Sequence, residues 1–262
     1  MSKLEAEEIR QAVWDNYRQV AQKGARGCAP STSCCGGSET VSLQLGYSQQ
    51  EVASVPDGSN LGLGCVNPQA IAALRPGETV LDLGSGGGFD CFLAARQVGE
   101  SGLVIGVDMT PEMIAKARAN ARKGGYSQVE FRLGEIEHLP VPDRSVDVIL
   151  SNCVINLSPD KPRVFQEAFR VLKPGGRLAI SDVVASIPLP EEFRNNPALL
   201  AGCVGGAVTV KEVEAMLLAS GFEQIQIRPK DESREFIREW APGQRIEDYV
   251  VSATIEAVRP II

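Results

Sequence analysis

From residue 79 onward the chain alternates between short apolar segments and amphipathic segments, and this alternation limits the fold more than any other feature. The apolar runs are bounded by polar or glycine-rich turns and read as buried strands, whereas the segments between them read as helices. We expect strands over residues 79–84, 102–109, 129–134, 146–151 and 177–184, and helices over 89–98, 111–124 and 161–172. Such alternation predicts an α/β fold with right-handed crossovers and a mostly parallel sheet covered on both faces.

The segments on either side of this region predict three parts. Residues 1–69 are expected to hold an amphipathic helix over 3–23 and an exposed loop over 24–40 that is rich in Gly, Ser and Thr and contains cysteines. Residues 70–186 are expected to form the α/β domain. Residues 187–262 have a less regular pattern and are expected to form a smaller C-terminal α+β lobe that binds the substrate.

Charge and hydropathy exclude several partners. The 262 residues carry a net charge of −7, and their lysines and arginines are scattered, which argues against a nucleic-acid partner. No apolar run approaches the ~18 residues that span a bilayer, and the charged N-terminus lacks the apolar core of a signal peptide. We therefore expect a cytoplasmic protein with no membrane contact. In that reducing compartment seven cysteines suggest ligands, reactive thiols or core residues rather than disulfides.

The stretch VLDLGSGGG, residues 80–88, joins a strand to a helix through a glycine-rich turn. Backbone amides and the helix dipole would face a ligand there, and Asp108, at the end of the next strand, is placed to bind ribose hydroxyls. A dinucleotide site is the first alternative, but Phe89 replaces the third glycine of its fingerprint. Asp82 would repel a pyrophosphate and suits a cationic cofactor. The residues therefore favour S-adenosylmethionine as methyl donor.

Three separated cysteines are the candidate substrate ligands. Cys153 follows the strand over 146–151, at the edge where ligands of parallel sheets bind. Cys65 and Cys203 stand in glycine-rich segments that fit either a close approach to a ligand or ordinary turns. Cys91, among apolar neighbours, is expected in the core.

A zinc ion is the main alternative that the cysteines could bind. Structural zinc sites use local C-x₂-C pairs, and the sequence has none. Its one histidine, His138, stands in a polar turn where we expect it to be solvated. A soft, three-coordinate thiophile therefore fits three isolated thiols better than zinc does.

Several motifs together resemble a known family. VLDLGSGGG, the strand-terminal Asp108, the acidic turn GEIEHLP and LKPGG are similar to class I S-adenosylmethionine-dependent methyltransferases over roughly residues 70–185. This resemblance implies a Rossmann-like domain. SNCVINLSPDK, GCVNP and the three separated cysteines narrow the resemblance to arsenite methyltransferases, and it then spans nearly the whole chain.

The resemblance also implies roles for individual residues. The implied cofactor-binding residues are Asp82, Gly84 and Gly86 at the methionine end, Asp108 and Met109 at the ribose and adenine, and Ile136, Glu137, Asn152 and Val154 around the adenine and sulfonium. The implied arsenic(III) ligands, and catalytic residues, are Cys65, Cys153 and Cys203. A thiol reductant, glutathione or thioredoxin, is the implied co-substrate, so thioredoxin is also an expected partner. Cys34 and Cys35 suit either capture of arsenite or a redox pair.

The expected reaction is therefore methyl transfer to trivalent arsenic, a step of arsenic detoxification. Arsenic bound by three thiolates keeps a lone pair that attacks the methyl group, and this lone pair carries no proton for a general base to remove. The alternative is a methyltransferase of a small organic molecule, quinone- or sterol-like, in which the cysteines are incidental. A third reading is a non-catalytic protein that senses S-adenosylmethionine or a metalloid.

Overall fold

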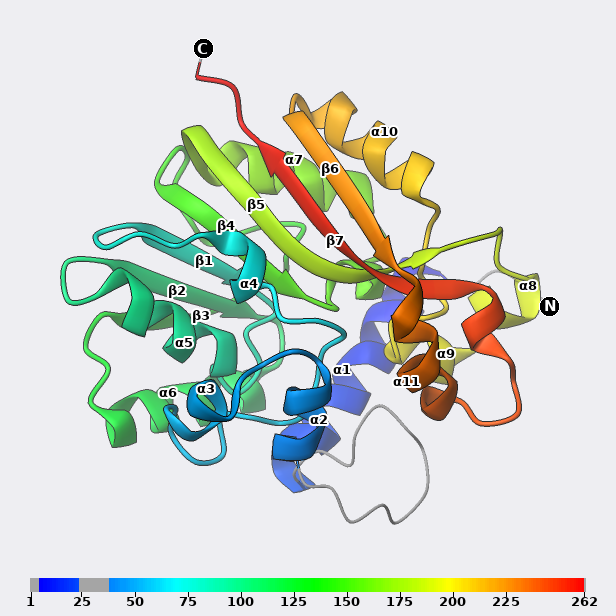
Figure 1. The fold of residues 1–262 in the computed structure, drawn as a ribbon, viewed down its shortest axis with the longest axis horizontal. Helices are drawn as coiled ribbons and strands as arrows, with labels where there is room; N and C mark the ends of the chain where they lie inside the picture. The colour runs from blue at the N-terminus through cyan, green and yellow to red at the C-terminus, as the bar shows by residue number, and fades with distance from the viewer. Residues whose placement is uncertain (1–4, 24–37, 262) are drawn as a thin grey trace.

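The computed structural model describes residues 5–23 and 38–261 (Figure 1). Within this part of the chain, seven strands form one sheet in the order β3-β2-β1-β4-β5-β7-β6. The strands are β1 (Thr79–Leu83), β2 (Leu103–Asp108), β3 (Val129–Leu133), β4 (Val146–Asn152), β5 (Leu172–Ala185), β6 (Glu223–Lys230) and β7 (Val250–Val258). Strands β1 to β5 pair in parallel, and β7 runs antiparallel to both β5 and β6. The mostly parallel α/β fold expected from the sequence is thus confirmed.

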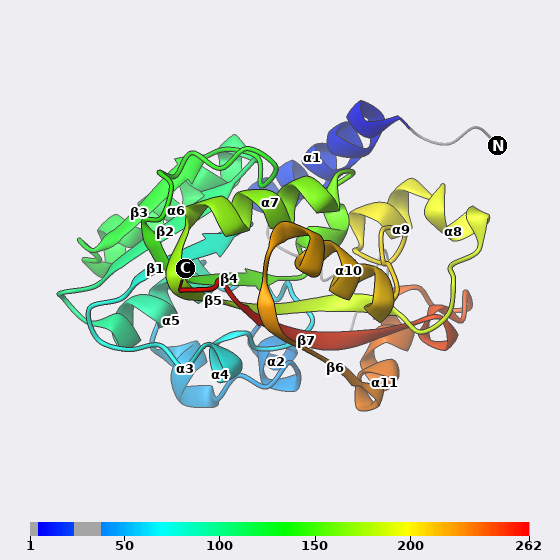
Figure 2. The same cartoon turned by 90° about the horizontal axis from the view of Figure 1, so that it is seen from above.

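Helices cover both faces of the sheet, so its central strands are buried on both sides. Figure 2 shows α7 (Lys161–Val171) and α10 (Val210–Ser220) on one face and α4 (Gln69–Ala72) and α5 (Phe89–Val98) on the other. In β1 the residues from Val80 to Leu83 are all buried. Helix α6 (Pro111–Gly124) follows β2 and packs on β2 and β3.

The N-terminal helix predicted over residues 3–23 is observed as α1 (Ala6–Lys23). It packs against α6, α9 (Pro197–Ala201) and η1 (Ile155–Leu157), which follows the carboxyl end of β4. Two short helices then lead to the sheet, α2 (Ser38–Gln44) and α3 (Gln49–Ala53). Helix α1 therefore lies beside the edge of the sheet where the parallel strands end. None of the helices in the described ranges has the length and apolar character of a membrane span.

The C-terminal segment completes the same sheet. Strands β6 and β7 join it through β5, and the remaining short helices are α8 (Glu191–Arg194), α11 (Arg234–Ile237), η2 (Asp231–Ser233), η3 (Arg238–Trp240) and η4 (Ile246–Asp248). Side chains from α8, α11, η3 and η4 form a hydrophobic cluster that also contains Cys65, Cys153 and Cys203. The expected boundary at residue 187 therefore crosses a continuous sheet, and the three-part division remains a prediction.

Candidate functional site

A pocket opens at the carboxyl ends of β1, β2 and β4. Its lining includes eight of the nine cofactor residues implied by the resemblance, together with Cys153 and Cys203. The full lining is Arg10, Val13, Tyr17, Leu63, Gly64, Gly84, Gly86, Asp108, Met109, Thr110, Gly134, Ile136, Glu137, Asn152, Cys153, Val154, Leu157, Ser158, Pro159 and Cys203. Residues from the glycine-rich turn, from strand ends and from α1 thus face one space.

The glycine-rich turn is built for close approach of a ligand. Gly84 has φ +68°, and a Cβ atom there would lie 2.4 Å from a methyl group of Val154. Gly86 has φ +50°, and a Cβ atom there would meet nothing within 4 Å, so this glycine faces open space. Its N–H donates to Asp108 Oδ2 at 3.0 Å, while Asp108 Oδ1 accepts from the Thr110 N–H at 2.8 Å. Burial raises the pKa of Asp108, and these two hydrogen bonds act in the opposite direction.

Asp82 lies beneath the turn rather than on the pocket wall. It is 3% exposed, is absent from the described lining, and accepts a hydrogen bond from Cys91 Sγ at 3.2 Å. Burial and then the nearby charge of Asp90 raise the pKa of Asp82 well above its ordinary value. Its implied contact with the methionine end therefore stays a prediction. Cys91, expected in the core, is fully buried.

Asn152 connects the cofactor side of the pocket to the Cys65 segment. Its Oδ1 accepts from the Cys65 N–H at 3.1 Å, and its Nδ2 donates to the Tyr47 hydroxyl at 3.0 Å and to Asp90 Oδ2 at 3.3 Å. A Cβ atom on Gly64 would lie 2.7 Å from the Asn152 amide, so the segment can approach only because this residue is glycine. Asn152 thereby fixes Cys65 relative to the end of β4.

The structure brings the three predicted cysteines together. Cys65, Cys153 and Cys203 are 0%, 7% and 3% exposed and belong to one cluster. The Cys153 thiol is within hydrogen-bonding reach of both other thiols, and Cys203 Sγ also donates to the Cys153 carbonyl oxygen at 2.6 Å. Within the described ranges, no three His, Cys, Asp or Glu side chains are arranged to hold a metal ion. Binding of one atom by all three thiols therefore requires their side chains to adjust.

Two of these cysteines have an unusual backbone conformation. Cys153 has φ +59° and Cys203 has φ +65°, in the left-handed region that non-glycine residues seldom occupy. Each costs on the order of 1 kcal/mol or more, which the surrounding contacts must offset. Left-handed backbone at both positions is a feature that the sequence pattern does not reveal.

The surroundings of Cys153 and Cys203 raise the pKa of both thiols. For Cys203, the hydrogen bond to Cys153 and then burial raise the pKa well above its ordinary value. For Cys153, the hydrogen bond from Cys203 lowers the pKa, but contact with Cys65, burial and the charge of Asp182 outweigh it and raise the pKa. Arsenite carries hydroxyl groups that leave as water when they take up thiol protons. Neutral thiols are therefore compatible with its binding.

Sequence reasoning missed the contribution of α1 to this site. Arg10, Val13 and Tyr17 line the pocket from one face of that helix, and Tyr17 contacts the Cys203 thiol. The helical spacing of apolar residues, Val13 and Tyr17 among them, predicted an amphipathic helix but gave no sign of which surface it covers. Arg10 also forms an ion pair of 3.8 Å with Glu135, which lies beside Ile136 in the acidic turn.

Other sequence predictions have mixed outcomes. His138 has a side chain 67% exposed, as expected for a solvated turn residue. Glu137 is buried and accepts a hydrogen bond of 2.5 Å from Ser158, a partner that the sequence did not indicate. Cys34 and Cys35 lie outside the described residues, so their proposed roles remain predictions.

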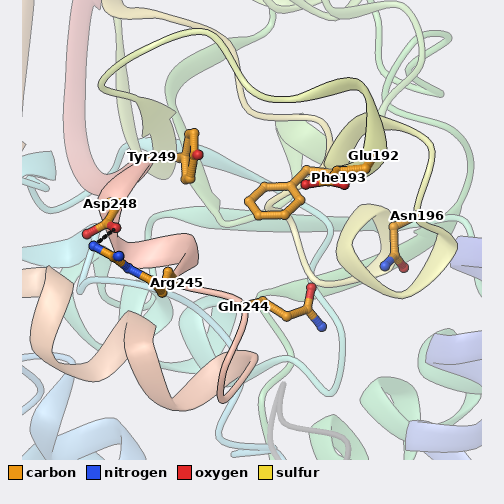
Figure 3. Close-up of a pocket in the computed structure, with 7 residues that line it drawn as sticks. All are labelled: Glu192, Phe193, Asn196, Gln244, Arg245, Asp248 and Tyr249. Atoms are coloured by element: carbon orange, nitrogen blue, oxygen red, sulfur yellow. Dashed lines mark ion pairs between the residues drawn. The ribbon is translucent and has the colours of Figure 1, made fainter.

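A second depression, of about 500 Å³, lies between α8, α9 and η4 (Figure 3). Its lining consists of Glu192, Phe193, Asn196, Gln244, Arg245, Asp248 and Tyr249. Arg245 pairs with Asp248 at 2.6 Å, and the rings of Phe193 and Tyr249 pack edge to face. Among the described residues, no cysteine and no residue of the glycine-rich turn lines this depression. It is therefore not the candidate site.

The residues of the first pocket fit a nucleoside with a charged tail. Gly86 leaves open space, and the Asp108 carboxylate stands at the end of β2 beside it. Apolar side chains of Met109, Ile136 and Val154 provide surfaces for an adenine ring. The free space enclosed is only about 100 Å³, below the ~300 Å³ of small ligand pockets. Arg10, Val13 and Tyr17 of α1 border this space.

Comparison with known proteins places this site in a family. Residues 74–221 match the model of a methyltransferase domain family. The chain is 55% identical to an arsenite methyltransferase of Halobacterium salinarum over 97% of its own length and 67% of that protein. It is 37% identical to the human arsenite methyltransferase over 85% of this chain and 60% of that one. The chain thus spans about two thirds or less of the length of these relatives.

A solved structure supports the same assignment. An arsenic(III) S-adenosylmethionine methyltransferase from Chlamydomonas reinhardtii superposes with a TM-score of 0.64 and 33% identity, covering 87% of this chain and 75% of that one. Its fold and sequence agree with the family match and with the curated relatives. The chain belongs to the arsenite methyltransferase family, within the S-adenosylmethionine-dependent methyltransferases.

Proposed function

We propose that the protein transfers the methyl group of S-adenosylmethionine to trivalent arsenic held by Cys65, Cys153 and Cys203. The single observation that carries this proposal is that Cys153 and Cys203 line the same pocket as Gly86 and Asp108. A metalloid on the thiols and a cofactor on the glycine-rich turn would share one enclosed space. Family membership supports the same substrate, since the curated relatives are named arsenite methyltransferases.

On the cofactor side, the chain supplies position and charge. S-adenosylmethionine would provide the methyl group as an electrophile on a sulfonium. The Asp108 carboxylate is already aligned by the N–H groups of Gly86 and Thr110, so it can accept ribose hydroxyls without reorganisation. The glycine-rich turn leaves room at Gly86 for the methionine end. These residues fix the direction from which the methyl group is presented.

On the substrate side, the thiols hold the reacting atom. Three Cys side chains exchange with the three hydroxyl groups of arsenite, releasing three waters and leaving the lone pair on arsenic. Holding both partners at close range converts a bimolecular displacement into an intramolecular one, which is the largest contribution that positioning can make. Cys153 is the residue best placed for this role, because it contacts both other thiols and follows the end of β4.

The same chemistry explains the proposed thiol co-substrate. When the lone pair forms the arsenic–carbon bond, the arsenic is formally oxidised from +3 to +5 while the cofactor leaves as a neutral thioether. Return to the trivalent state needs two electrons, which two thiols supply as they form a disulfide. Glutathione and thioredoxin are both reductants of this class, and thioredoxin would then also be a partner.

Labelled methyl transfer tests the proposal. The protein would be incubated with methyl-labelled S-adenosylmethionine, arsenite and a thiol reductant, beside a panel of quinone- and sterol-like acceptors. We expect labelled arsenicals and no labelled organic product. Label on an organic acceptor alone would establish the alternative function, and cofactor binding without any transfer would establish a non-catalytic sensor.

A further inference from the structure

Asp182 is a buried carboxylate on β5 that none of the sequence motifs indicated. It is 2% exposed and lies one position beyond the residue that pairs with Asn152 at the end of β4. Its Oδ2 accepts from the Ile155 N–H at 2.9 Å. Its Oδ1 accepts from Asn156 Nδ2 at 2.9 Å and from the Val183 N–H at 2.7 Å. Two of these three donors belong to the turn that follows Cys153.

These contacts hold Cys153 from both sides. The Cys153 N–H donates to the Ser181 carbonyl oxygen at 2.8 Å, and the backbone two residues later is held by the Asp182 carboxylate. Between these two anchors Cys153 has φ +59°. A non-glycine residue persists in this region when its surroundings determine the conformation. Adjacent residues of β5 therefore determine the direction of the Cys153 side chain.

The same network reaches the Cys203 segment through Asn156. Asn156 Nδ2 donates to the Val183 carbonyl oxygen at 2.6 Å as well as to Asp182. The Asn156 carbonyl oxygen is so close to Gly206 that a Cβ atom there would lie 2.0 Å from it. Gly206 is three residues after Cys203, so the placement of Asn156 sets the approach of the Cys203 segment.

We propose that Asp182 is a positioning residue for the thiol site, which holds the turn from Cys153 to Asn156 so that the Cys153 and Cys203 thiols face one another. This inference rests on the proposed arsenic-binding function. It adds a residue that touches neither the cofactor nor the arsenic.

Positioning and charge predict opposite effects of an Asp182 substitution on arsenite affinity. Asp182 acts on both Cys153 and Cys203 to raise their pKa values, and Lys161 is the cation that faces Asp182 from α7. If Asp182 acted only through its charge, removing the charge would favour thiolate formation and strengthen arsenite binding. Positioning predicts the opposite, because a displaced Cys153 binds arsenic less well.

Asp182→Asn separates these effects. The amide can keep its oxygen where Oδ1 accepts two hydrogen bonds, but its NH₂ group then faces the Ile155 N–H, where two donors repel. Asp147→Asn is the matched control, because Asp147 is a carboxylate near the opposite end of β4 that accepts from the Thr79 N–H and from Lys173. Each variant would be titrated calorimetrically with arsenite and, separately, with S-adenosylmethionine.

We expect Asp182→Asn to weaken arsenite binding tenfold or more and to change cofactor affinity less than twofold, while Asp147→Asn changes neither by more than twofold. Equal or tighter arsenite binding in Asp182→Asn contradicts the proposal, and so does an equal loss of both ligands. Asn156→Ala removes the second arm of the network and should give the same pattern. Combined with Asp182→Asn, it should cost less than the sum of the single losses.

A second readout does not depend on arsenic. Diamide takes two electrons and two protons from a pair of nearby thiols and leaves a disulfide, which peptide mapping locates. We expect the Cys153–Cys203 disulfide to form at least fivefold more slowly in Asp182→Asn than in the wild-type protein. If the wild-type protein fails to bind arsenite, the proposed function is wrong, yet slower disulfide formation still supports positioning and equal rates refute it.

Discussion

Cys203 Sγ donates a hydrogen bond to the carbonyl oxygen of Cys153 at 2.6 Å, across 50 positions of sequence. Both residues have left-handed backbone, and both line the pocket that contains the glycine-rich turn. The two thiols are also within hydrogen-bonding reach of one another. The pair therefore forms the fixed part of the proposed arsenic site, to which Cys65 is added from a separate segment.

Gly86→Ala is expected to spare the fold and impair cofactor binding. A Cβ atom at Gly86 meets no protein atom within 4 Å, and the positive φ costs about 1 kcal/mol for alanine. The methyl group would instead occupy space that the cofactor needs. Thermal unfolding should show a modest loss of stability, and calorimetry should show S-adenosylmethionine affinity reduced more than tenfold. Unchanged affinity in a folded variant would mean that the cofactor binds elsewhere.

Asp108→Ala tests the ribose contact. The carboxylate lines the pocket and has its two oxygens aligned by backbone N–H groups, so its loss should remove a charge-assisted hydrogen bond of roughly 1.5–3 kcal/mol. S-adenosylmethionine affinity should then fall by about tenfold to a hundredfold in a calorimetric titration. Asp82→Ala provides the comparison, because Asp82 is buried beneath the turn. A smaller effect there would assign Asp82 to stability, and an effect equal to that of Asp108 would support its implied contact with the methionine end.

The parallel strands of the sheet could be predicted from the sequence because each strand has a local signal. Apolar runs and glycine-rich turns fix where strands begin and end, and the alternation with helices implies parallel pairing. The position of β7 between β5 and β6 could not be read in this way, since it depends on long-range antiparallel pairing. The shared sheet crosses the expected boundary at residue 187, and the three-part division stays a prediction.

Sequence motifs predicted part of the candidate site. The residues that reach the site only through the packing of distant segments could not be predicted. Gly84, Gly86 and Asp108 follow from strand ends, and the structure gathers them around one pocket. Tyr17 and Asp182 have no motif, because their roles arise only when distant segments pack beside the thiols. Neither backbone strain at a cysteine nor a buried carboxylate leaves a periodic signal in the sequence.

Asp182 should make stability depend on pH. Burial raises its pKa from 3.8 to about 6, so the folded protein holds this proton more tightly than the unfolded chain does. The resulting stability is fully present below the unfolded pKa and is lost as pH rises through about 6, by roughly 3 kcal/mol in total. Asp182→Asn lacks this loss. Urea unfolding at pH 4 and pH 7 should therefore show the wild type losing about that much relative to the variant, whereas a constant difference would contradict the raised pKa.

Cys65→Ser should separate the two methylation steps. Arsenite offers three exchangeable positions, but monomethylarsenite offers two, so one cysteine becomes dispensable for the second step. We assign that place to Cys65, because it belongs to the N-terminal segment and its backbone N–H donates to Asn152, whereas Cys203 donates directly to the Cys153 carbonyl oxygen. We expect Cys65→Ser to lose activity on arsenite and keep it on monomethylarsenite, and Cys153→Ser and Cys203→Ser to lose both. Wild-type rates on arsenite in Cys65→Ser would refute the three-thiolate site.

X-ray absorption at the arsenic edge tests the central claim most directly, namely that the three cysteines bind arsenic together. The measurement would use one equivalent of arsenite in a protein whose Cys28, Cys34 and Cys35 are replaced by serine, and in the same protein carrying Cys65→Ser or Cys91→Ser. We predict three sulfur neighbours in the parent and in Cys91→Ser, and two sulfurs with one oxygen in Cys65→Ser. A parent with fewer than three sulfurs, or a sulfur count that Cys65→Ser leaves unchanged, would contradict the account.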